Sequence, residues 1–354
     1  MDLQNLASHG TRSAESPPHQ GYRHYQRKRN APQSPEDTSE DNNFLEKLIG
    51  MPIRYSYKDL KTATKNFSNK IGQGGFGSVY LGVLPDGTRL AVKKTEANID
   101  WKKEFQAEVT ISGSIHHLHL ARLRGFCAKG SNRLLAYEYM ANGSLDKWIF
   151  RKKNEEFVLD SETRFTIAVG IAKGLAYLHE DCDLNIIHCD IKPHNVLLDD
   201  NYHAKVSDFG LAVLMAREQS SLWNIILLLE IISGRKNLDL DDERYLPSYA
   251  SKMFEEGKLQ DIFDPKMRID DVDERVSTAV MVALWCIQLD VTLRPPMTKV
   301  VQMLQGICSV PQPPIPRLYP NELPKRGTSS RPSEYRTATA MPLLQISPNP
   351  TDLN

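Results

Sequence analysis

The chain has 354 residues, of which 40% are hydrophobic and 25% are charged, and its formal net charge is zero. This composition is typical of a globular protein with a sizeable core, and the balanced charge gives no indication of a nucleic-acid partner. The five cysteines lack CxxC spacing, which argues against a disulfide framework or a zinc site and for reduced thiols in a cytosol-like compartment.

Both ends of the chain are predicted to be disordered. Residues 1–50 are rich in Ser, Pro and charged residues and show little apolar periodicity, and residues 309–354 form a Pro/Ser-rich tail. The first segment contains a basic cluster, which we interpret either as a solvated run or as a weak contact with an anionic membrane surface. This cluster consists of Arg23, Arg27, Lys28 and Arg29.

The sequence predicts no membrane-spanning helix. Its most apolar stretch, Leu222–Ile232, covers 11 residues, whereas a spanning helix needs about 20. We therefore interpret this stretch as a buried core helix. Because no secretory signal opens the chain, the sequence as written predicts a cytoplasmic protein.

The region between the two ends has a clear order of strands and helices. Its apolar patterns predict strands over Ile71–Tyr80 and Leu90–Lys94, a helix over Lys102–Ile111, a strand over Leu134–Tyr139 and a long helix over 168–178. A glycine cluster ends the first strand, and a Pro-Asp-Gly turn precedes the second. Strands come first and helices dominate after Gly143, which predicts two lobes rather than one layered sheet.

A glycine-rich motif lies in the first predicted strand. It reads Gly72-Gln73-Gly74-Gly75-Phe76-Gly77-Ser78-Val79 and fits G-x-G-x-x-G-x-V. Glycines allow the backbone to fold closely over phosphate groups. Dinucleotide-binding folds use a similar string, but theirs opens a helix, whereas here a second strand follows. The context favours a phosphate-binding loop between strands.

The second predicted strand contains Ala91-Val92-Lys93, and Glu108 follows 15 residues later on the predicted helix. A lysine fixed between a carboxylate and a nucleotide neutralises charge on the phosphates. Taken alone, either residue is as easily an exposed surface charge. Their order after the glycine motif favours an ion pair at a nucleotide site.

The most specific pattern is Ile187-His188-Cys189-Asp190-Ile191-Lys192-Pro193-His194-Asn195, with Asp208-Phe209-Gly210 starting 13 residues after its end. Together the two motifs resemble the catalytic loop and the metal-binding loop of protein kinases. By this resemblance, Asp190 orients the hydroxyl nucleophile and accepts its proton, and Lys192 stabilises the transferring phosphoryl group. Asn195 and Asp208 would hold Mg²⁺. Phosphoryl transfer depends on such alignment and charge neutralisation.

Several further segments resemble plant receptor-like kinases, and in particular the S-domain lectin receptor-like serine/threonine kinases, over roughly residues 20–310. These segments are Tyr55–Leu60, Thr62–Phe67, Gly113–Leu120, Tyr137–Leu145 and Ala283–Gln288. The resemblance implies an α+β, two-lobed kinase fold, with a small antiparallel β lobe carrying one helix and a larger, mainly helical lobe that is incomplete here. It also implies ATP and Mg²⁺ as cofactors, and full-length relatives that are plasma-membrane receptors.

The resemblance further implies domain boundaries and an ATP-binding set. The expected divisions are a disordered juxtamembrane-like segment 1–50, a lead-in 51–70, an N-lobe 71–142, a C-lobe 143–308 and a disordered tail 309–354. Tyr137 would be the gatekeeper, and Glu138–Met140 the hinge that contacts adenine. The ATP-binding set comprises Ile71, Gly72, Gln73, Gly74, Gly75, Phe76, Gly77, Val79, Ala91, Lys93, Glu108, Glu138 and Met140.

Three histidines, His116, His117 and His119, have a metal-binding interpretation that the pattern does not favour. Their spacing does not place three imidazoles on one helical face. The resemblance puts them in a linker before a strand. We therefore do not expect a metal site there.

The chain departs from the family pattern in two places. Cys189 replaces the arginine that pairs with a phosphorylated activation loop, so such phosphorylation is a poor candidate for its switch. After Ser221, roughly 30 residues of the family pattern are missing, including the peptide-binding loop and an Ala-Pro-Glu motif. Arg294 matches the arginine that pairs with that glutamate, and we expect it to lack this partner.

Two hypotheses about function remain from the sequence. The first is an active serine/threonine protein kinase, because every nucleotide and catalytic residue is in place. The second is an ATP-binding pseudokinase, or a shortened splice or gene-model product, that acts as an interaction module. The missing segment favours the second hypothesis, and the sequence leaves the protein substrate unknown.

Overall fold

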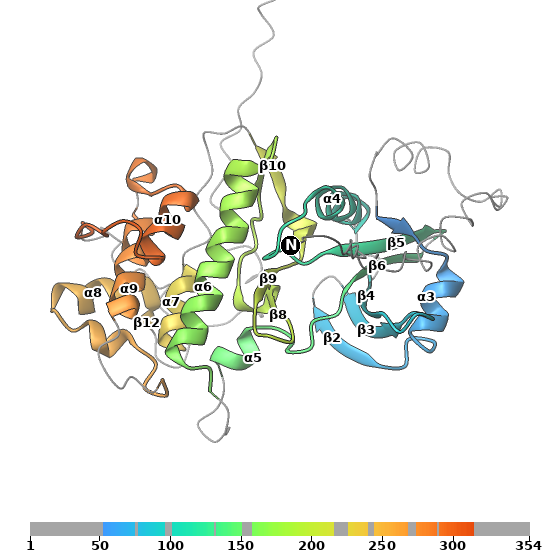
Figure 1. Cartoon of the computed structure of the whole chain (residues 1–354), viewed down its shortest axis with the longest axis horizontal. Coiled ribbons are helices and arrows are strands. Elements are labelled where there is room, and N and C mark those ends of the chain that lie inside the picture. Colours follow the sequence, from blue (N-terminus) through green and yellow to red (C-terminus); the bar gives the residue numbers. More distant parts are fainter. Residues whose placement is uncertain are drawn as a thin grey trace, which may run out of the picture. The chain divides into compact units, whose positions relative to one another are not determined.

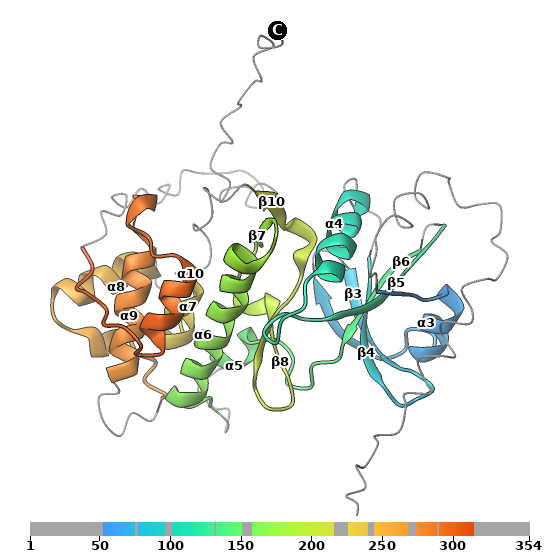
Figure 2. The same ribbon diagram turned by 45° about the horizontal axis from the view of Figure 1, so that its top comes forward.

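The computed structural model describes residues 52–74, 77–95, 101–130, 132–150, 158–215, 226–239, 244–267, 274–288 and 290–314. The basic cluster of the first segment and most of the predicted tail lie outside these residues. The described elements form a β-rich small lobe followed by a helical large lobe, with the short strands β7–β10 between α6 and the small lobe (Figure 1, Figure 2). This is the two-lobed α+β fold expected from the sequence.

The small lobe is built on a six-stranded sheet with the order β1-β5-β6-β4-β3-β2. All neighbouring strands are antiparallel except β1 and β5, which are parallel. The strands are β1 (Ile53–Arg54), β2 (Lys70–Gly74), β3 (Gly77–Val83), β4 (Arg89–Lys94), β5 (Leu123–Lys129) and β6 (Asn132–Glu138).

The alternation of side chains along β4 and β6 separates two faces of this sheet. Leu90 and Val92 pack in one apolar cluster with α3 (Tyr57–Ala63). Tyr137 packs in a second cluster with α4 (Trp101–Ser114), against which Ala91 also packs. Lys93 lies two residues after Ala91 and therefore on the α4 face, which is the face that the site uses.

The segment Ile71–Tyr80, predicted as one strand, is a hairpin of β2 and β3. The prediction of a single strand was wrong because the glycines lie at the reversal rather than at the strand end. Gly74 pairs with Gly77, whose φ is +132°, a value that side-chain-bearing residues rarely adopt. The predicted strand at Leu90–Lys94 and the helix at Lys102–Ile111 are confirmed, the latter as part of α4.

Helix α3 belongs to the predicted lead-in and has a sequence-encoded start. Ser56 accepts a hydrogen bond from the Asp59 amide at 3.1 Å, and the Asp59 carboxylate accepts one from the Ser56 amide at 3.4 Å. This capping box satisfies two backbone donors that the first turn leaves open. Together with β1, α3 joins the lead-in segment to the sheet.

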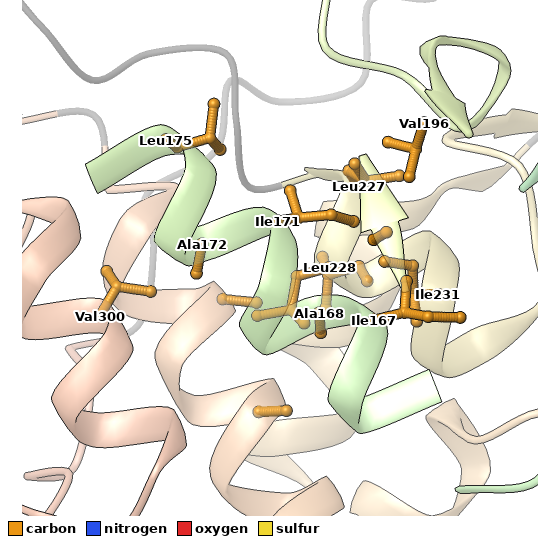
Figure 3. Close-up of a cluster of buried hydrophobic side chains, with 14 of the residues drawn as sticks. Ile167, Ala168, Ile171, Ala172, Leu175, Val196, Leu227, Leu228, Ile231 and Val300 are labelled. Carbon is orange, nitrogen blue, oxygen red and sulfur yellow. The ribbon is translucent and has the colours of Figure 1, made fainter. Parts of the chain in front are cut away.

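The large lobe contains the main apolar core, which gathers on helix α6 (Figure 3). Its helices are α5 (Asp146–Ile149), α6 (Ser161–Ala176), α7 (Ile226–Ser233), α8 (Leu246–Glu255), α9 (Glu274–Cys286) and α10 (Met297–Leu304). Ile171 and Leu175, which belong to the periodicity that predicted this helix, lie on one face of α6 and are almost fully buried, as is Ile167. The predicted extension to residue 178 continues as a π-helical turn, Tyr177–Asp181.

A buried ion pair fixes α6 to the rest of the large lobe. Arg164 donates to the Asp264 carboxylate at 2.7 Å, to the Ile231 carbonyl at 2.9 Å and to the Leu159 carbonyl at 3.1 Å. The side chains of Arg164 and Asp264 are only 3% and 4% exposed. Because a buried guanidinium is costly unless it is well paired, these contacts constrain the packing of α6 on α7.

Four short strands carry the loops that matter for function. They are β7 (Asn185–Ile187), β8 (Val196–Leu198), β9 (Ala204–Val206) and β10 (Val213–Met215), and they pair as β7–β10 and β8–β9. The loop with Asp190 therefore runs between β7 and β8, and Asp208 follows β9 directly. Two further short strands, β11 (Leu238–Asp239) and β12 (Arg244–Tyr245), precede α8.

The predicted boundary between the C-lobe and the tail, at residues 308 and 309, falls near structured contacts. The Trp285 indole donates to the Pro311 carbonyl at 2.9 Å, and the Gln288 amide donates to the Pro314 carbonyl at 2.8 Å. The first residues of the predicted tail are thus attached to α9 and its end. In the part of the chain that the structure describes, no helix has the length and apolarity to cross a membrane.

Candidate active site

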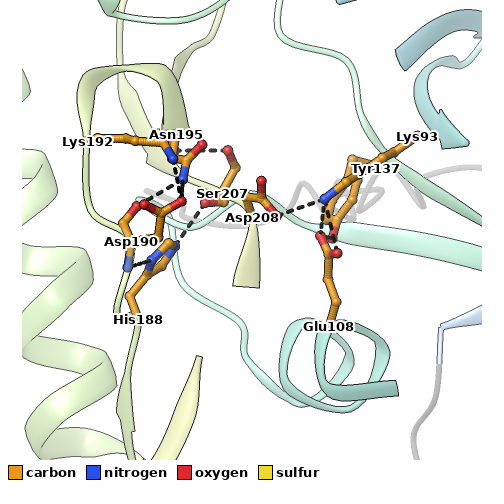
Figure 4. Close-up of polar contacts among 9 residues, drawn as sticks. All are labelled: Lys93, Glu108, Tyr137, His188, Asp190, Lys192, Asn195, Ser207 and Asp208. Carbon is orange, nitrogen blue, oxygen red and sulfur yellow. Dashed lines mark hydrogen bonds and ion pairs between the residues drawn. The ribbon is translucent and has the colours of Figure 1, made fainter. Parts of the chain in front are cut away.

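An ion-pair network joins the two lobes at Lys93 (Figure 4). Its ammonium lies 3.1 Å from Glu108 Oε2, on α4, and 2.8 Å from Asp208 Oδ1, just after β9. The sequence predicted the pairing with Glu108. The contact with Asp208, 115 residues further along the chain, connects a small-lobe strand to the loop that the sequence predicted to bind Mg²⁺.

The electrostatics of this network favour a charged lysine. Burial alone would lower the pKa of Lys93, but the carboxylates of Glu108 and Asp208 outweigh it and raise that pKa above its usual value. The pKa of Glu108 is also raised, chiefly because the carboxyl group is fully buried, and the nearby Lys93 ammonium opposes that shift. The network therefore keeps a positive charge at the end of β4.

Tyr137 contributes a contact that the sequence did not predict. Its hydroxyl donates a hydrogen bond to Glu108 Oε1. The buried position raises the pKa of Tyr137 well above 10, so this hydroxyl stays a donor. The sequence indicated only that Tyr137 is the gatekeeper, a position near Lys93. It did not indicate that the Tyr137 hydroxyl would bond to Glu108. The contact fixes α4 against β6.

A second network surrounds Asp190 in the large lobe (Figure 4). Lys192 Nζ lies 2.6 Å from Asp190 Oδ2. Asn195 Nδ2 donates to the backbone carbonyl and to Oδ2 of Asp190, both at 2.9 Å. The three predicted catalytic residues are thus brought together within the loop between β7 and β8. One carboxylate oxygen of Asp190 carries both side-chain contacts.

Buried residues behind the loop connect these two networks. His188 is fully buried, and its Nε2 lies 2.9 Å from the Ser207 carbonyl. The Ser207 hydroxyl and amide donate to the Asn195 carbonyl at 2.9 and 2.8 Å. The His188 ring packs on the ring of the fully buried Phe209, with the ring centroids 4.8 Å apart. These contacts fix Asp208 relative to Asp190, because Ser207 precedes Asp208.

Two non-glycine residues of these loops have left-handed backbones. Cys189 has φ of +62° and Asp208 has φ of +70°. Such conformations are uncommon for residues with a side chain and tend to occur at functional sites. The Cys189 thiol is partly buried, which raises its pKa, and it contacts the Ile187 carbonyl at 3.5 Å. A cysteine at this position cannot form the ion pair that an arginine would make with a phosphorylated activation loop.

The glycine motif folds as the β2–β3 hairpin described above. A side chain at Gly77 would place its Cβ 2.1 Å from the Lys94 carbonyl oxygen, so only glycine fits there. A Cβ at Gly72 or Gly74 would meet no such clash. Gly75 and Phe76 lie outside the described residues, whereas Gln73 is exposed on β2.

Two of the remaining residues of the predicted ATP-binding set, Val79 and Ala91, lie on the same face of the sheet as Lys93. Val79 is paired with Lys93, and Ala91 with Tyr137, so these side chains share one face. Ile71 on β2 is partly buried. At the predicted hinge, Met140 is 7% exposed, and the Glu138 side chain points to the Arg122 amide and to Lys205.

Comparison with known proteins identifies the family. Residues 66–234 match the protein kinase domain. The chain is 36% identical to a probable receptor-like protein kinase of Arabidopsis thaliana, over 86% of this chain and 77% of that protein. This chain belongs to the receptor-like protein kinases.

The chain is also similar to larger proteins of this kind. It is 53% identical to the G-type lectin S-receptor-like serine/threonine-protein kinase SD2-5 of Arabidopsis thaliana, over 92% of this chain and 45% of that protein. It is 40% identical to the rust resistance kinase Lr10 of Triticum aestivum, over 75% of this chain and 47% of that protein. The receptor-like kinase described here therefore spans less than half the length of both.

The predicted shortening of this receptor-like kinase has a counterpart in these comparisons. The match with the G-type lectin relative extends over 369 residues, which is more than the 354 residues of the whole chain. That relative therefore contains residues within the matched stretch that this chain lacks. The junction after Ser221 lies in residues 216–225, which are outside the described residues.

Among the described residues, the side chain of Arg294 is only partly satisfied. Its Nε donates to the Gln288 carbonyl at 2.7 Å, but its buried Nη1 has no hydrogen-bond partner there. Burial lowers the pKa of this guanidinium, and Cys286 and Asp290 only partly offset that effect.

Proposed function

We propose that this chain is an ATP-dependent protein kinase that transfers the γ-phosphate to serine and threonine hydroxyls. The observation that carries the proposal is the Lys93 network, in which Glu108 of the small lobe and Asp208 of the large lobe hold one ammonium. The names of the relatives support the serine/threonine specificity. The same relatives do not favour the alternative of a pseudokinase or interaction module.

ATP would bind on the α4 face of the sheet. The β2–β3 hairpin would cover the phosphates with its backbone amides, and Lys93 would neutralise part of their charge. The hinge at Glu138–Met140 would contact the adenine through backbone groups. Because Glu108 pairs with Lys93 and is itself held by the Tyr137 hydroxyl, the ammonium would be oriented before the nucleotide arrives.

The oxygen atoms of Asn195 and Asp208 fit a magnesium ion. Asn195 uses its amide nitrogen on Asp190, which leaves its side-chain oxygen available, and Asp208 uses Oδ1 on Lys93, which leaves Oδ2. Carboxylate and amide oxygens are the ligands that Mg²⁺ prefers. Bound Mg²⁺ would neutralise charge on the phosphates during transfer.

Asp190 would accept the proton of the attacking hydroxyl. Lys192 and Asn195 hold one of its carboxylate oxygens at 2.6 and 2.9 Å, which orients the other oxygen for the substrate. Lys192 then also places a positive charge next to the position of the transferring phosphoryl group. His188 and Ser207 support this loop from its buried side.

The proposal also covers the protein substrates and a membrane contact. The substrates would be hydroxyl groups of proteins, and this class includes the serines and threonines of the chain's own terminal segments. The basic cluster Arg23, Arg27, Lys28 and Arg29 would give a weak contact with an anionic membrane surface. We make no proposal of nucleic-acid binding.

The test is transfer of labelled γ-phosphate from Mg-ATP to the chain itself and to a generic basic protein. We expect transfer by the wild type and a loss of about 10²–10⁴-fold in Asp190→Asn, the range typical of a lost general base. Asp200→Asn is the matched control, because its carboxylate is 67% exposed and pairs only with Arg89 at 3.6 Å among the described residues. A folded wild type without transfer, or an Asp190→Asn variant as active as the wild type, would overturn the proposal.

A further inference from the structure

A polar cleft lies outside the ATP-binding set, apart from its contact with Glu138. It has a volume of about 300 Å³ and lies between the linker after α4, the end of β6 and strand β9. Its polar walls come from His116, His117, Arg122, Glu138 and Lys205. Lys93, Asp190 and Asp208 do not line it, so a ligand here would not occupy the catalytic centre.

The carboxylate in this cleft is already paired. Glu138 Oε1 accepts the Arg122 amide at 3.0 Å and lies 3.3 Å from Lys205 Nζ, while Oε2 lies 3.9 Å from Arg124. Lys205 also donates to the Leu118 carbonyl at 2.9 Å. An ammonium group has three hydrogens, so Lys205 keeps one for a ligand.

Arg122 is the second cationic group of the cleft. Its side chain is exposed, and its guanidinium makes no hydrogen bond or ion pair with the described residues. A guanidinium offers five donors in a planar fork that matches the oxygens of phosphate and carboxylate groups. Arg122 therefore brings a free set of donors to a cleft whose only carboxylate among the described residues is engaged.

His117 adds a neutral donor. Its Nδ1 accepts the His119 amide at 3.2 Å, which places the ring proton on Nε2. The ring is stacked on Tyr177, with centroids 5.0 Å apart and an interplanar angle of 16°. Burial lowers the pKa of His117, and His119, Lys173 and Lys205 lower it further against the opposing effect of Asp181. His117 thus contributes an Nε2–H donor to the cleft.

We propose that this cleft binds a phosphate group, as a free phosphate ion or as a phosphorylated side chain. Lys205, Arg122 and His117 supply charged and neutral donors around a space at the lower end of the size range of ligand pockets. The phosphate would bridge the two lobes, because Arg122 belongs to the small lobe and Lys205 to β9, three residues before Asp208. Its binding would therefore stabilise the relative position of the lobes.

The experiment is a titration of the full chain with inorganic phosphate at constant ionic strength. A saturating non-hydrolysable ATP analogue with Mg²⁺ occupies the nucleotide site, and affinity is measured by calorimetry and by the imidazole NMR signal of His117. We expect Arg122→Gln to weaken phosphate binding at least about tenfold. Lys129→Gln, which removes one exposed charge at the end of β5, should bind like the wild type.

Equal phosphate affinities of Arg122→Gln and the wild type would overturn the proposal, and so would a His117 signal that phosphate does not move. A phosphoserine peptide and its unphosphorylated form distinguish the two sources. Tighter binding of the phosphopeptide than of inorganic phosphate indicates a phosphorylated side chain, and equal affinities indicate the ion itself. None of these readouts needs phosphoryl transfer, so a failure of the proposed kinase activity would be seen separately.

Discussion

Lys93 is a largely buried cation and Arg294 a partly buried one, and their surroundings differ. Lys93 lies between the carboxylates of Glu108 and Asp208, and the buried Glu108 has a further donor in Tyr137. Arg294 has one hydrogen bond, to Gln288, and a buried Nη1 without a partner among the described residues. The cation at the proposed nucleotide site is thus paired with two carboxylates, whereas Arg294 keeps a buried donor without a partner among the described residues.

This difference separates two requirements of a kinase. The groups that we propose to align ATP and to accept a proton come from segments that the chain retains. The groups that bind a peptide come, in the family, from the segment that the sequence lacks after Ser221. We therefore expect the chain to transfer phosphate to its own hydroxyls faster than to other proteins. Misplacing a substrate by about 1 Å can lower the rate about 10²-fold, and a separate protein substrate would lack the segment that positions it.

Arg164 is a buried arginine of the same lobe, and its Nε and both Nη atoms donate hydrogen bonds, unlike those of Arg294. Arg164→Met should lower the free energy of unfolding by about 3–5 kcal/mol, because it leaves the buried Asp264 carboxylate without its cation. Urea unfolding measures this change. The double variant Arg164→Met/Asp264→Asn should recover part of the loss. A loss below about 1 kcal/mol in the single variant would contradict a structural role for the pair.

Lys93→Met tests the paired side of the comparison. Phosphoryl transfer should fall by about 10²–10³-fold, because the charge that the phosphates would meet is removed. Lys94→Met is the matched control, since it changes the next residue of β4, whose ammonium lies 5.1 Å from the Phe67 ring. Initial rates with labelled ATP measure both. Similar rates in the two variants would show that Lys93 has no special role.

Glu230 predicts a pH dependence of stability in the large lobe. Burial raises the pKa of its carboxyl group from 4.5 to about 7, against the Asn237 amide and Lys236, which lower it. The folded state therefore binds a proton that the unfolded state has lost between about pH 4.5 and 7, and stability falls as the pH rises through this window.

The size of this effect is up to about 3 kcal/mol. Glu230→Gln should remove this fall, because glutamine still accepts the Asn237 amide hydrogen bond, seen at 2.9 Å, without titrating. The difference in unfolding free energy between the two proteins, measured in urea from pH 4 to 8, isolates Glu230 from other titrating groups. A difference that stays constant with pH would contradict the raised pKa.

Arg294→Met should have the smallest effect. The change removes one hydrogen bond to Gln288 but also a buried donor without a partner, so the free energy of unfolding should move by no more than about 1 kcal/mol. Thermal or urea unfolding measures it. A loss as large as that expected for Arg164→Met would mean that Arg294 has a partner in residues outside the described ones.

The sequence predicted local features of the site better than its long-range contacts. The order of the glycine motif, Lys93 and Glu108 follows from short spacings along two strands and one helix, and the structure confirms the Lys93–Glu108 pair. The hairpin within Ile71–Tyr80 was missed because a glycine inside a strand pattern fits a strand end as well as a reversal. In the structure, the positive φ of Gly77 and its pairing with Gly74 show that the chain reverses there.

Contacts between distant segments could not be read from the sequence. Arg164 and Asp264 are 100 residues apart, and a charged residue on a helix is ordinarily exposed. Tyr137 and Glu108 are 29 residues apart on different elements. In each case tertiary packing decides which polar groups are buried together. The absence of an Ala-Pro-Glu motif, in contrast, can be read from the sequence itself.

Phosphorylation of the chain by its own catalytic centre is the most direct test of a kinase whose catalytic groups are complete. The full chain, treated first with a phosphatase and then freed of it, is incubated with Mg-ATP, and its intact mass and phosphorylated residues are determined by mass spectrometry. We predict phosphate on serine and threonine residues in the wild type and, over the same time, at least about 10²-fold less in Asp190→Asn. A folded wild type that gains no phosphate would contradict the proposed activity.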